Sequence, residues 1–397
     1  MSDQEKVAAQ EALLAYMRLG QMGYILSVPV PVMLYIGLRS LNLSEMTGAA
    51  QDMVRGYCIT AVSAGGAGSL KLADYYMGLA MEADKKHDDV AAHALCLSFW
   101  GGNRLGGCRW DEAIEALEAA AVVNHRIGSD IDRDLNLHNL AFVLQKTGRP
   151  DQVRAIRNEV LASAERREDQ QLIIWTLFYT IEDNLRLVGP GHIEEMHDLL
   201  DRAQRLLADH PNQASRILAQ CLSAQVNYRS GDLAGARQGA ETALRLIRTE
   251  RVLLLPYFAD TQAGLPFVAL SLWEAADGAD GQGLAHDAVK FIRNQAKAST
   301  AYLLPRASLY QGTYEWLSGK HRRAENSWAK CLALAEQFDM PYDQGLAHFE
   351  IGRHLPASDP ARKQHLQQAA DLFAQVGSVW NLALVKPVLR QGSSLAR

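Results

Sequence analysis

Residues 95 to 123 read LCLSFWGGNRLGGCRWDEAIEALEAAAVV. Gly101 is a small residue within the first apolar run, and Trp110 is an aromatic residue that directly follows the glycine-rich GGCR segment. Ala113 and Leu117 then lie one helical turn apart in the second run. Antiparallel helices approach to about 8 to 10 Å only where small side chains face larger ones. The stretch therefore predicts two antiparallel helices joined by a short turn.

The same pattern recurs along the chain at a spacing of 40 residues. In the first helix, the matched column is Ala61, Gly101 and Ala141. In the second helix there are three matched columns: Leu70, Trp110 and Pro150; Ala73, Ala113 and Val153; and Ala80, Ala120 and Val160. Further matches are Met33 and Ser40 upstream, and Met196, Leu200 and Ala203, Ala236, Ala240 and Ala243, Ala285 and Val289, and Ala324, Trp328 and Cys331 downstream. A fixed internal period of this length indicates a repeat protein.

The two-helix pattern resembles the tetratricopeptide repeat (TPR). We therefore expect an all-α fold, a right-handed superhelical solenoid of about nine helix-turn-helix repeats, with helices of about 16 or 17 residues. We expect residues 1–397 to form a single TPR-like domain. The expected repeats span residues 5–48, 49–88, 89–128, 129–168, 169–210, 211–250, 251–300, 301–340 and 341–390.

Turn residues separate the expected helices. Gly148 and Pro150, the GPG segment at residues 189–191, and Ser230-Gly231-Asp232 supply positive φ, fixed φ or a helix cap. Pro256 and Pro266 lie where a helix would otherwise continue, so we expect a kink or an irregular repeat between Leu253 and Gly283.

Composition excludes several classes of function. The formal net charge is −5, and the basic residues are interspersed with acidic ones, so the sequence has no basic stripe for nucleic acid. The five cysteines lack a CxxC pair and fit buried residues of a reducing compartment. The N-terminal residues do not resemble a secretory signal, and the apolar stretch from Tyr24 to Leu38 contains two prolines and is too short for a membrane span. We expect a cytoplasmic protein that binds neither nucleic acid nor membrane directly.

Several segments resemble catalytic or cofactor-binding motifs, but none has the required residues at the required spacing. The segment SAGGAGSLK at residues 63–71 lacks the spacing of a phosphate-binding loop, and DGADGQG at 277–283 lacks the alternating ligands of a calcium loop. His192 and His197 are five residues apart, whereas the metal-binding HExxH motif places its histidines four residues apart. His348, His354 and His365 could converge in space, but we interpret them as solvated or capping residues. The sequence therefore predicts no catalytic residue, no cofactor and no metal ion.

Three long segments resemble the TPR-like arms of bacterial signalling ATPases and of their relatives fused to adenylate cyclase domains. They are MLYIGLRSLNLSEMTGAAQDMVRGY at residues 33–57, QGTYEWLSGKHRRAENSWAKCLALAEQFDMPYDQGLAHFEIGRHL at 311–355, and HLQQAADLFAQVGSVWNLALV at 365–385. In that family the arm follows a nucleotide-binding module and senses or docks a partner. These residues contain no such module, so the resemblance implies the docking role without the ATP-dependent switch.

The first helix of each repeat is expected to line a concave groove, where a partner would bind. The candidate contact residues are His138, Phe142, Gln145 and Lys146 on one helix, Tyr179, Glu182 and Asp183 on the next, and Gln225, Tyr228 and Arg229 on a third. We expect Arg154 and Arg157, on a second helix, to face solvent. Three hypotheses follow: a non-catalytic scaffold for a protein or peptide partner, a sensory arm that binds a small-molecule or protein effector, and a subunit of a biosynthetic complex.

Overall fold

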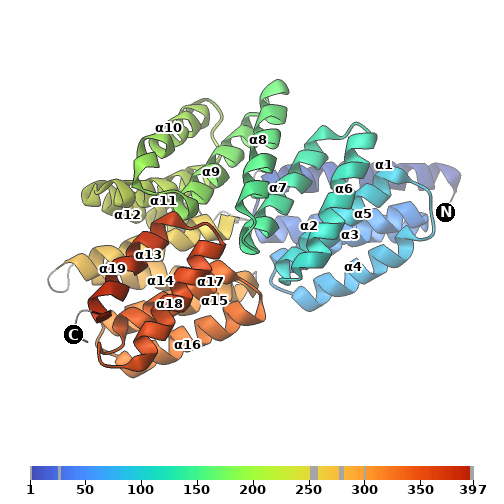
Figure 1. Cartoon of the computed structure of the whole chain (residues 1–397). Helices are drawn as coiled ribbons and strands as arrows, with labels where there is room; N and C mark the ends of the chain where they lie inside the picture. Colours follow the sequence, from blue (N-terminus) through green and yellow to red (C-terminus); the bar gives the residue numbers. More distant parts are fainter. Residues whose placement is uncertain (1, 26–27, 251–257, 277–280, 299–300, 394–397) are drawn as a thin grey trace. The chain divides into compact units, whose positions relative to one another are not determined.

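The computed structural model describes residues 2–25, 28–250, 258–276, 281–298 and 301–393. Over these residues the chain is helical, without a β-strand (Figure 1). The first ten helices are α1 (Asp3–Ile25), α2 (Val30–Thr47), α3 (Ala50–Gly66), α4 (Leu70–Asp84), α5 (Val90–Gly106), α6 (Trp110–Arg126), α7 (Asp130–Lys146), α8 (Pro150–Arg166), α9 (Gln170–Leu187) and α10 (Ile193–Asp209). They are followed by α11 (Gln213–Ser230), α12 (Leu233–Glu250), α13 (Ala259–Ala275), α14 (Gln282–Ala298), α15 (Leu304–Leu317), α16 (His321–Gln337), α17 (Pro341–His354), α18 (Pro360–Gln375) and α19 (Val379–Ser393). The expected all-α helical-repeat fold is confirmed.

The turns between helices repeat a single backbone motif. A residue with positive φ recurs at Gly68, Cys108, Gly128, Gly148 and Glu168, in steps of 20 or 40 residues. The amide that follows each of these residues bonds to the carbonyl five residues earlier, as Arg109 N does to Arg104 O at 2.9 Å. This is the Schellman arrangement, which satisfies the last carbonyls of a helix. A helix of about 17 residues and a three-residue turn thus account for the 40-residue period of a helix pair.

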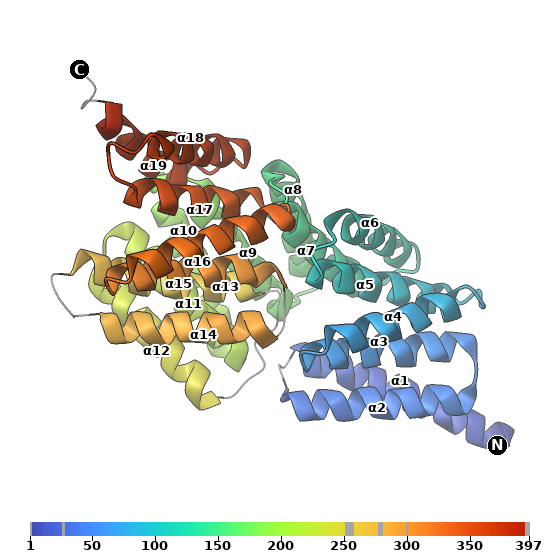
Figure 2. The same ribbon diagram turned by 90° about the horizontal axis from the view of Figure 1, so that it is seen from below.

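Close helix crossings occur where the sequence places small residues. A Cβ built on Gly101 of α5 would lie 2.6 Å from Cγ of Leu117 on α6. Gly345 of α17 meets the ring of Phe373 on α18 in the same way, and Ala113 and Ala120 are fully buried. Side chains this small are what allow the backbones of paired helices to come together. Figure 2 shows the resulting antiparallel pairing for α15 to α18.

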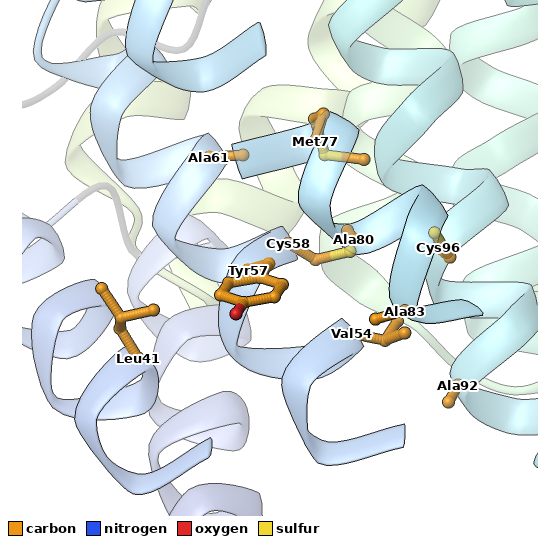
Figure 3. Packing of buried hydrophobic residues seen from close by; sticks show 10 residues of the cluster. All are labelled: Leu41, Val54, Tyr57, Cys58, Ala61, Met77, Ala80, Ala83, Ala92 and Cys96. Atoms are coloured by element: carbon orange, nitrogen blue, oxygen red, sulfur yellow. The ribbon is translucent and has the colours of Figure 1, made fainter. Parts of the chain in front are cut away.

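The chain divides into two compact units. The first is built mainly from residues 2–143, and the second mainly from residues 144–250, 258–296 and 302–393. In the first unit, α2 to α5 enclose an apolar cluster that includes Val54, Cys58 and Met77, shown in Figure 3. The single domain and the nine repeat boundaries remain predictions, although each expected repeat contains one of the helix pairs α1–α2 to α17–α18.

In the second unit, the C-terminal helix packs against a helix from much earlier in the chain. Residues of α19 contact α9, and the Ser378 hydroxyl, in the turn before α19, donates a 2.6 Å hydrogen bond to the Arg186 carbonyl at the end of α9. Val376 lies beside Gly148, at the turn between α7 and α8. These contacts bring the ends of α7, α9 and α19 together in the second unit.

Helix α13 continues without interruption through Pro266, whereas Pro256 lies outside the described residues. The segment at 63–71 ends α3 and begins α4, and residues 277–280 of the calcium-like segment lie outside the described residues. The stretch from Tyr24 to Leu38 contains the end of α1 and the start of α2. Among the described helices, none is both long and apolar enough to cross a membrane.

Candidate functional site

Eight charged side chains gather inside the second unit, and we call them the inner charge cluster. Its members are Lys146, Arg157, Glu182, Asp183, Arg186, Asp260, Arg306 and Asp343. All eight are buried. Except for Arg157 of α8, they come from the odd-numbered helices α7, α9, α13, α15 and α17. Burial of ions is costly unless they are paired and hydrogen-bonded, so the pairing within the cluster decides its character.

Asp260 is the centre of the cluster. Its Oδ2 accepts a hydrogen bond from Lys146 Nζ, and its Oδ1 lies 3.2 Å from Nη2 of Arg186. Burial alone would raise the pKa of Asp260, but the charges of Lys146 and Arg186 outweigh it and lower that pKa. Burial lowers the pKa of Lys146, and Asp260 opposes that change. The carboxylate is therefore held in its ionised form by two cations from different helices.

The two acids of α9 connect the cluster to its neighbours. Glu182 accepts a 2.7 Å hydrogen bond from the Thr261 hydroxyl and lies 3.4 Å from Arg186. Asp183 lies 3.3 Å from Nε of Arg157 and also accepts a bond from the amide of Gln145. Burial raises the pKa of Glu182, since desolvation outweighs the nearby Arg186. Ionisation of Glu182 is therefore less favourable than that of an exposed glutamate.

A second ion pair extends the cluster to α15 and α17. Arg306 Nε lies 2.5 Å from Oδ1 of Asp343, and both side chains are buried. The guanidinium groups of Arg186 and Arg306 lie 5.1 and 5.2 Å, respectively, from the centroid of the Tyr342 ring. Burial raises the pKa of the neighbouring Tyr310 to about 12. The aromatic rings therefore serve as partners for cations in a region that excludes water.

A small pocket borders the cluster. Its lining residues are Gln145, Gly148, Arg149, Pro150, Val153, Asp183, Arg186, Leu187, Tyr342 and Val376. The amide oxygen of Gln145 accepts a 2.8 Å bond from Arg186, so the polar part of the lining is held in place by the cluster. Arg149 is the exposed cation among these residues. The pocket is small and combines an apolar wall with a few fixed polar groups.

Arg229, at the end of α11, is a further cation on the same side of the unit. Its Nη2 donates a 2.8 Å hydrogen bond to the Leu185 carbonyl on α9. The guanidinium lies 3.7 Å from the ring centroid of Trp380 on α19. Gln225, one turn earlier, donates to the Thr261 carbonyl at 3.1 Å. Helices α9, α11, α13 and α19 thus meet around these two residues of α11.

The ten candidate contact residues are placed differently from one another. His138 and Phe142 are buried in the first unit, and the other eight belong to the second. Gln145, Lys146, Glu182 and Asp183 come together in or beside the inner charge cluster. Tyr228 packs edge-on against Phe267. The candidate residues of α7 and α9 therefore lie close together, but inside the charged core of the second unit and not on an open groove.

The expected open aromatic surface is not what the structure shows. Phe142 is 1% exposed and Tyr179 is 5% exposed. Tyr179 stacks on Phe258 and lies under the guanidinium of Arg157, because a large ring on a first helix fills space against the next helix. Arg157 was expected to face solvent, and that expectation was wrong. It is 3% exposed and bonded to Asp183, whereas Arg154 is exposed as expected.

Sequence reasoning missed five of the eight residues of the cluster. These five are Arg157, Arg186, Asp260, Arg306 and Asp343. A signal was present, since Arg306 is the one charged residue in the mainly apolar and aromatic segment AYLLPRASLY at residues 301–310. A charge on the apolar stripe of a helix must find a buried partner. The sequence could not identify that partner, because Asp343 lies on the following helix pair.

Several histidines lie in small groups, and Asp84 lies 3.5 Å from His87 and 2.7 Å from His93. His348 and His365 are adjacent, with their Nδ1 atoms 2.8 Å apart, and His354 stacks separately on Trp328. No group of three or more His, Cys, Asp or Glu side chains in the described ranges could hold a metal ion. Burial raises the pKa of the Cys221 thiol, which makes it a poor nucleophile.

The helix pairs, their turns and their close crossings make the chain a TPR-like helical-repeat protein. It is similar to a solved structure of a Rap protein in complex with competence and sporulation factor, with a TM-score of 0.61 over 99% of both chains. The two sequences are 12% identical, so the similarity shows the fold alone. No protein-family model and no curated protein matches the chain. The resemblance to the arms of signalling ATPases therefore remains a prediction beyond the repeat fold itself.

Proposed function

We propose that this chain is a non-catalytic adaptor that binds a segment of a partner polypeptide at the pocket beside the inner charge cluster. The pocket supports this function because buried, fixed polar groups reach its lining. Asp183, Arg186 and Gln145 offer both acceptors and donors, as a polypeptide backbone requires. Arg149 adds an exposed charge at which a partner's acidic residue can select its register.

The fold agrees with this role. The structurally similar Rap protein was crystallised with competence and sporulation factor, so a chain with this arrangement of helices can hold another molecule. The cations and acids of the cluster are held by each other and by aromatic rings, which is the rigidity that a recognition site needs. The buried thiol of Cys221 is a poor nucleophile, and His348 contacts another histidine, His365.

A second candidate is a sensory arm that binds a small effector. The observation that favours it is the pocket itself, which joins an apolar wall of Val153, Leu187 and Val376 to the polar groups of Asp183 and Arg186. Pockets of that composition typically take small ligands. Native mass spectrometry of the purified protein distinguishes the two functions. A retained small molecule adds a small, fixed mass to the chain, whereas a polypeptide partner adds a larger mass that fragmentation identifies as a peptide sequence.

Site-directed photocrosslinking tests the adaptor function. A photoreactive amino acid replaces Arg149 at the pocket or, as the control, Arg154 on the exposed face of α8. Crosslinking in cells should capture a polypeptide from position 149 and not from position 154. The captured polypeptide, purified, should then bind the wild-type chain and bind Arg149→Glu about tenfold more weakly. Equal capture at both positions, or unchanged affinity in Arg149→Glu, would contradict the proposal.

A further inference from the structure

Arg229 differs from the cations of the inner charge cluster in its choice of partners. Lys146, Arg186 and Arg306 each contact a carboxylate. Arg229 contacts a backbone carbonyl and an aromatic ring, and within the described part of the chain no carboxylate pairs with it. Burial lowers the pKa of Arg229 to about 10. The guanidinium is therefore a largely desolvated charge without a counter-ion.

The neighbouring charges do not supply the counter-ion that Arg229 lacks. The cluster contains four cations, namely Lys146, Arg157, Arg186 and Arg306, and four acids, namely Glu182, Asp183, Asp260 and Asp343. The cluster is thus balanced before Arg229 is counted. The aromatic rings in contact with Arg229 belong to Trp380 and Phe267, and neither ring carries a charge. The guanidinium of Arg229 is only partly exposed and has no counter-ion among the described residues, so one negative charge from a ligand would neutralise it.

Trp380 supplies a second, independent sign of a missing acceptor. Its ring lies under the guanidinium, and its indole Nε1 is buried without a hydrogen-bond partner among the described residues. Buried indole N–H groups normally find an acceptor. Arg229 and Trp380 are both donors, they are in direct contact, and neither has an anionic acceptor.

We propose that Arg229 and Trp380 form a subsite for a carboxylate group. A carboxylate carries the single negative charge that one guanidinium neutralises, and its two oxygens can accept from two donors at once. A phosphate dianion would leave one charge unpaired. This proposal rests on the adaptor function, because it assigns the carboxylate to a bound polypeptide, either its C-terminus or an acidic side chain.

A purely structural role explains only part of the site. The bond from Arg229 to the Leu185 carbonyl caps the last turn of α9, where carbonyls lack helical partners. That bond occupies one of the five N–H donors of the guanidinium. It supplies neither a counter-ion for Arg229 nor an acceptor for Nε1 of Trp380. Both needs are met by one carboxylate.

Saturation-transfer NMR on the full chain tests the subsite with three small probes. N-acetylglycine presents a chain-terminal carboxylate, the α-amide of N-acetylaspartic acid presents a side-chain carboxylate, and N-acetylglycinamide presents none. At least one of the two carboxylate probes should bind saturably, and N-acetylglycinamide should not. The probe that binds more tightly identifies the source of the carboxylate as chain end or side chain.

Variants attribute the binding to the proposed residues. Arg229→Gln should weaken binding of the carboxylate probe about tenfold. Trp380→Phe, which keeps an aromatic ring but removes the N–H group, should weaken it about threefold. Arg216→Gln, on an exposed face of the same helix, should leave the affinity unchanged. If Arg229→Gln does not fold, Trp380→Phe still decides, because it preserves the ring under the guanidinium.

The outcomes separate this proposal from the adaptor function. Failure of both carboxylate probes to bind, or equal affinity in the wild type and in Trp380→Phe, would overturn the subsite. A polypeptide captured at position 149 would then leave the adaptor function standing. Conversely, carboxylate binding that depends on Arg229, without any captured polypeptide, would support the subsite and contradict the adaptor function.

Discussion

Asp260 of α13 lies 3.2 Å from Nη2 of Arg186 on α9, and its second oxygen accepts a bond from Lys146 of α7. One buried carboxylate therefore joins the first helices of three helix pairs. Helix pairs in a solenoid otherwise contact mainly their neighbours. An ion at this position holds α7 and α9, which both contribute residues to the lining of the proposed binding pocket, to α13.

Asp260→Asn should strongly destabilise the second unit. The substitution leaves Lys146 and Arg186 buried with one fewer negative charge between them. Breaking a buried ion pair from one side typically costs about 3 to 5 kcal/mol. Denaturant unfolding monitored by circular dichroism gives the change in free energy. Asp287→Asn, at the exposed pair with Arg248, should cost at most about 1 kcal/mol, and equal losses in the two variants would show that the cluster is not held by Asp260.

The fold could be predicted from the sequence because the residues that make the helix contacts recur with a fixed period. Gly101, Ala113 and Ala120 recur with their counterparts 40 residues away, and each of these residues lies at a helix contact. The turn residues Gly148 and Gly231 have the positive φ that was expected. Periodicity is a local property of the chain, so it can be recognised without knowledge of the partners in space.

The candidate site was predicted less well, for a reason that Tyr179 illustrates. Helix phase correctly assigned it to a first helix, but phase does not reveal whether another helix covers that face. Phe258 and Arg157 cover it, and so Tyr179 is buried. Likewise, Lys146 was a candidate while its partner Asp260 was not, because that pairing depends on tertiary structure. Contacts between distant helices have no signature in a single sequence.

Gly101→Ala should destabilise the first unit by about 1 to 3 kcal/mol through overpacking. The new Cβ would lie 2.6 Å from Leu117 Cγ and 3.4 Å from its backbone nitrogen, so the two helices must separate. Gly78→Ala is the matched control, since Gly78 is exposed within α4 and has open space around its missing Cβ. That control should gain up to about 1 kcal/mol from helix propensity. Thermal or denaturant unfolding of both variants measures the contrast, and a change of the same sign in both would refute it.

Glu168→Gly should stabilise the chain by about 0.5 to 1 kcal/mol. Glu168 is exposed and has a φ of 55°, a conformation that costs energy for any residue with a Cβ. The reverse change, Gly128→Ala, places a Cβ at a φ of 73° where nothing lies within 4 Å. It should therefore lose a similar amount through backbone strain alone. Chemical denaturation gives both values, and a loss of stability in Glu168→Gly would mean that its side chain contributes more than the strain.

His348 should make the stability of the C-terminal helices depend on pH between about 4 and 6.5. Its Nδ1 lies 2.8 Å from Nδ1 of His365, and burial, together with the neighbouring His365, lowers the pKa of His348 to about 4. The unfolded chain, with a histidine pKa near 6.5, binds more protons than the folded chain in this window. The contribution of His348 is therefore fully present above about pH 6.5 and is lost as the pH falls toward 4.

The size of this effect follows from the shift in pKa, which corresponds to about 3 kcal/mol. Urea unfolding of the wild type at a series of pH values should show the free energy of unfolding falling across the window. His348→Gln, which retains a group able to bond with Nδ1 of His365, should show a smaller fall over the same range. His125→Gln, at an exposed position of α6, should retain the wild-type slope. A wild-type slope in His348→Gln would mean that the imidazole pair is not what makes folding depend on pH.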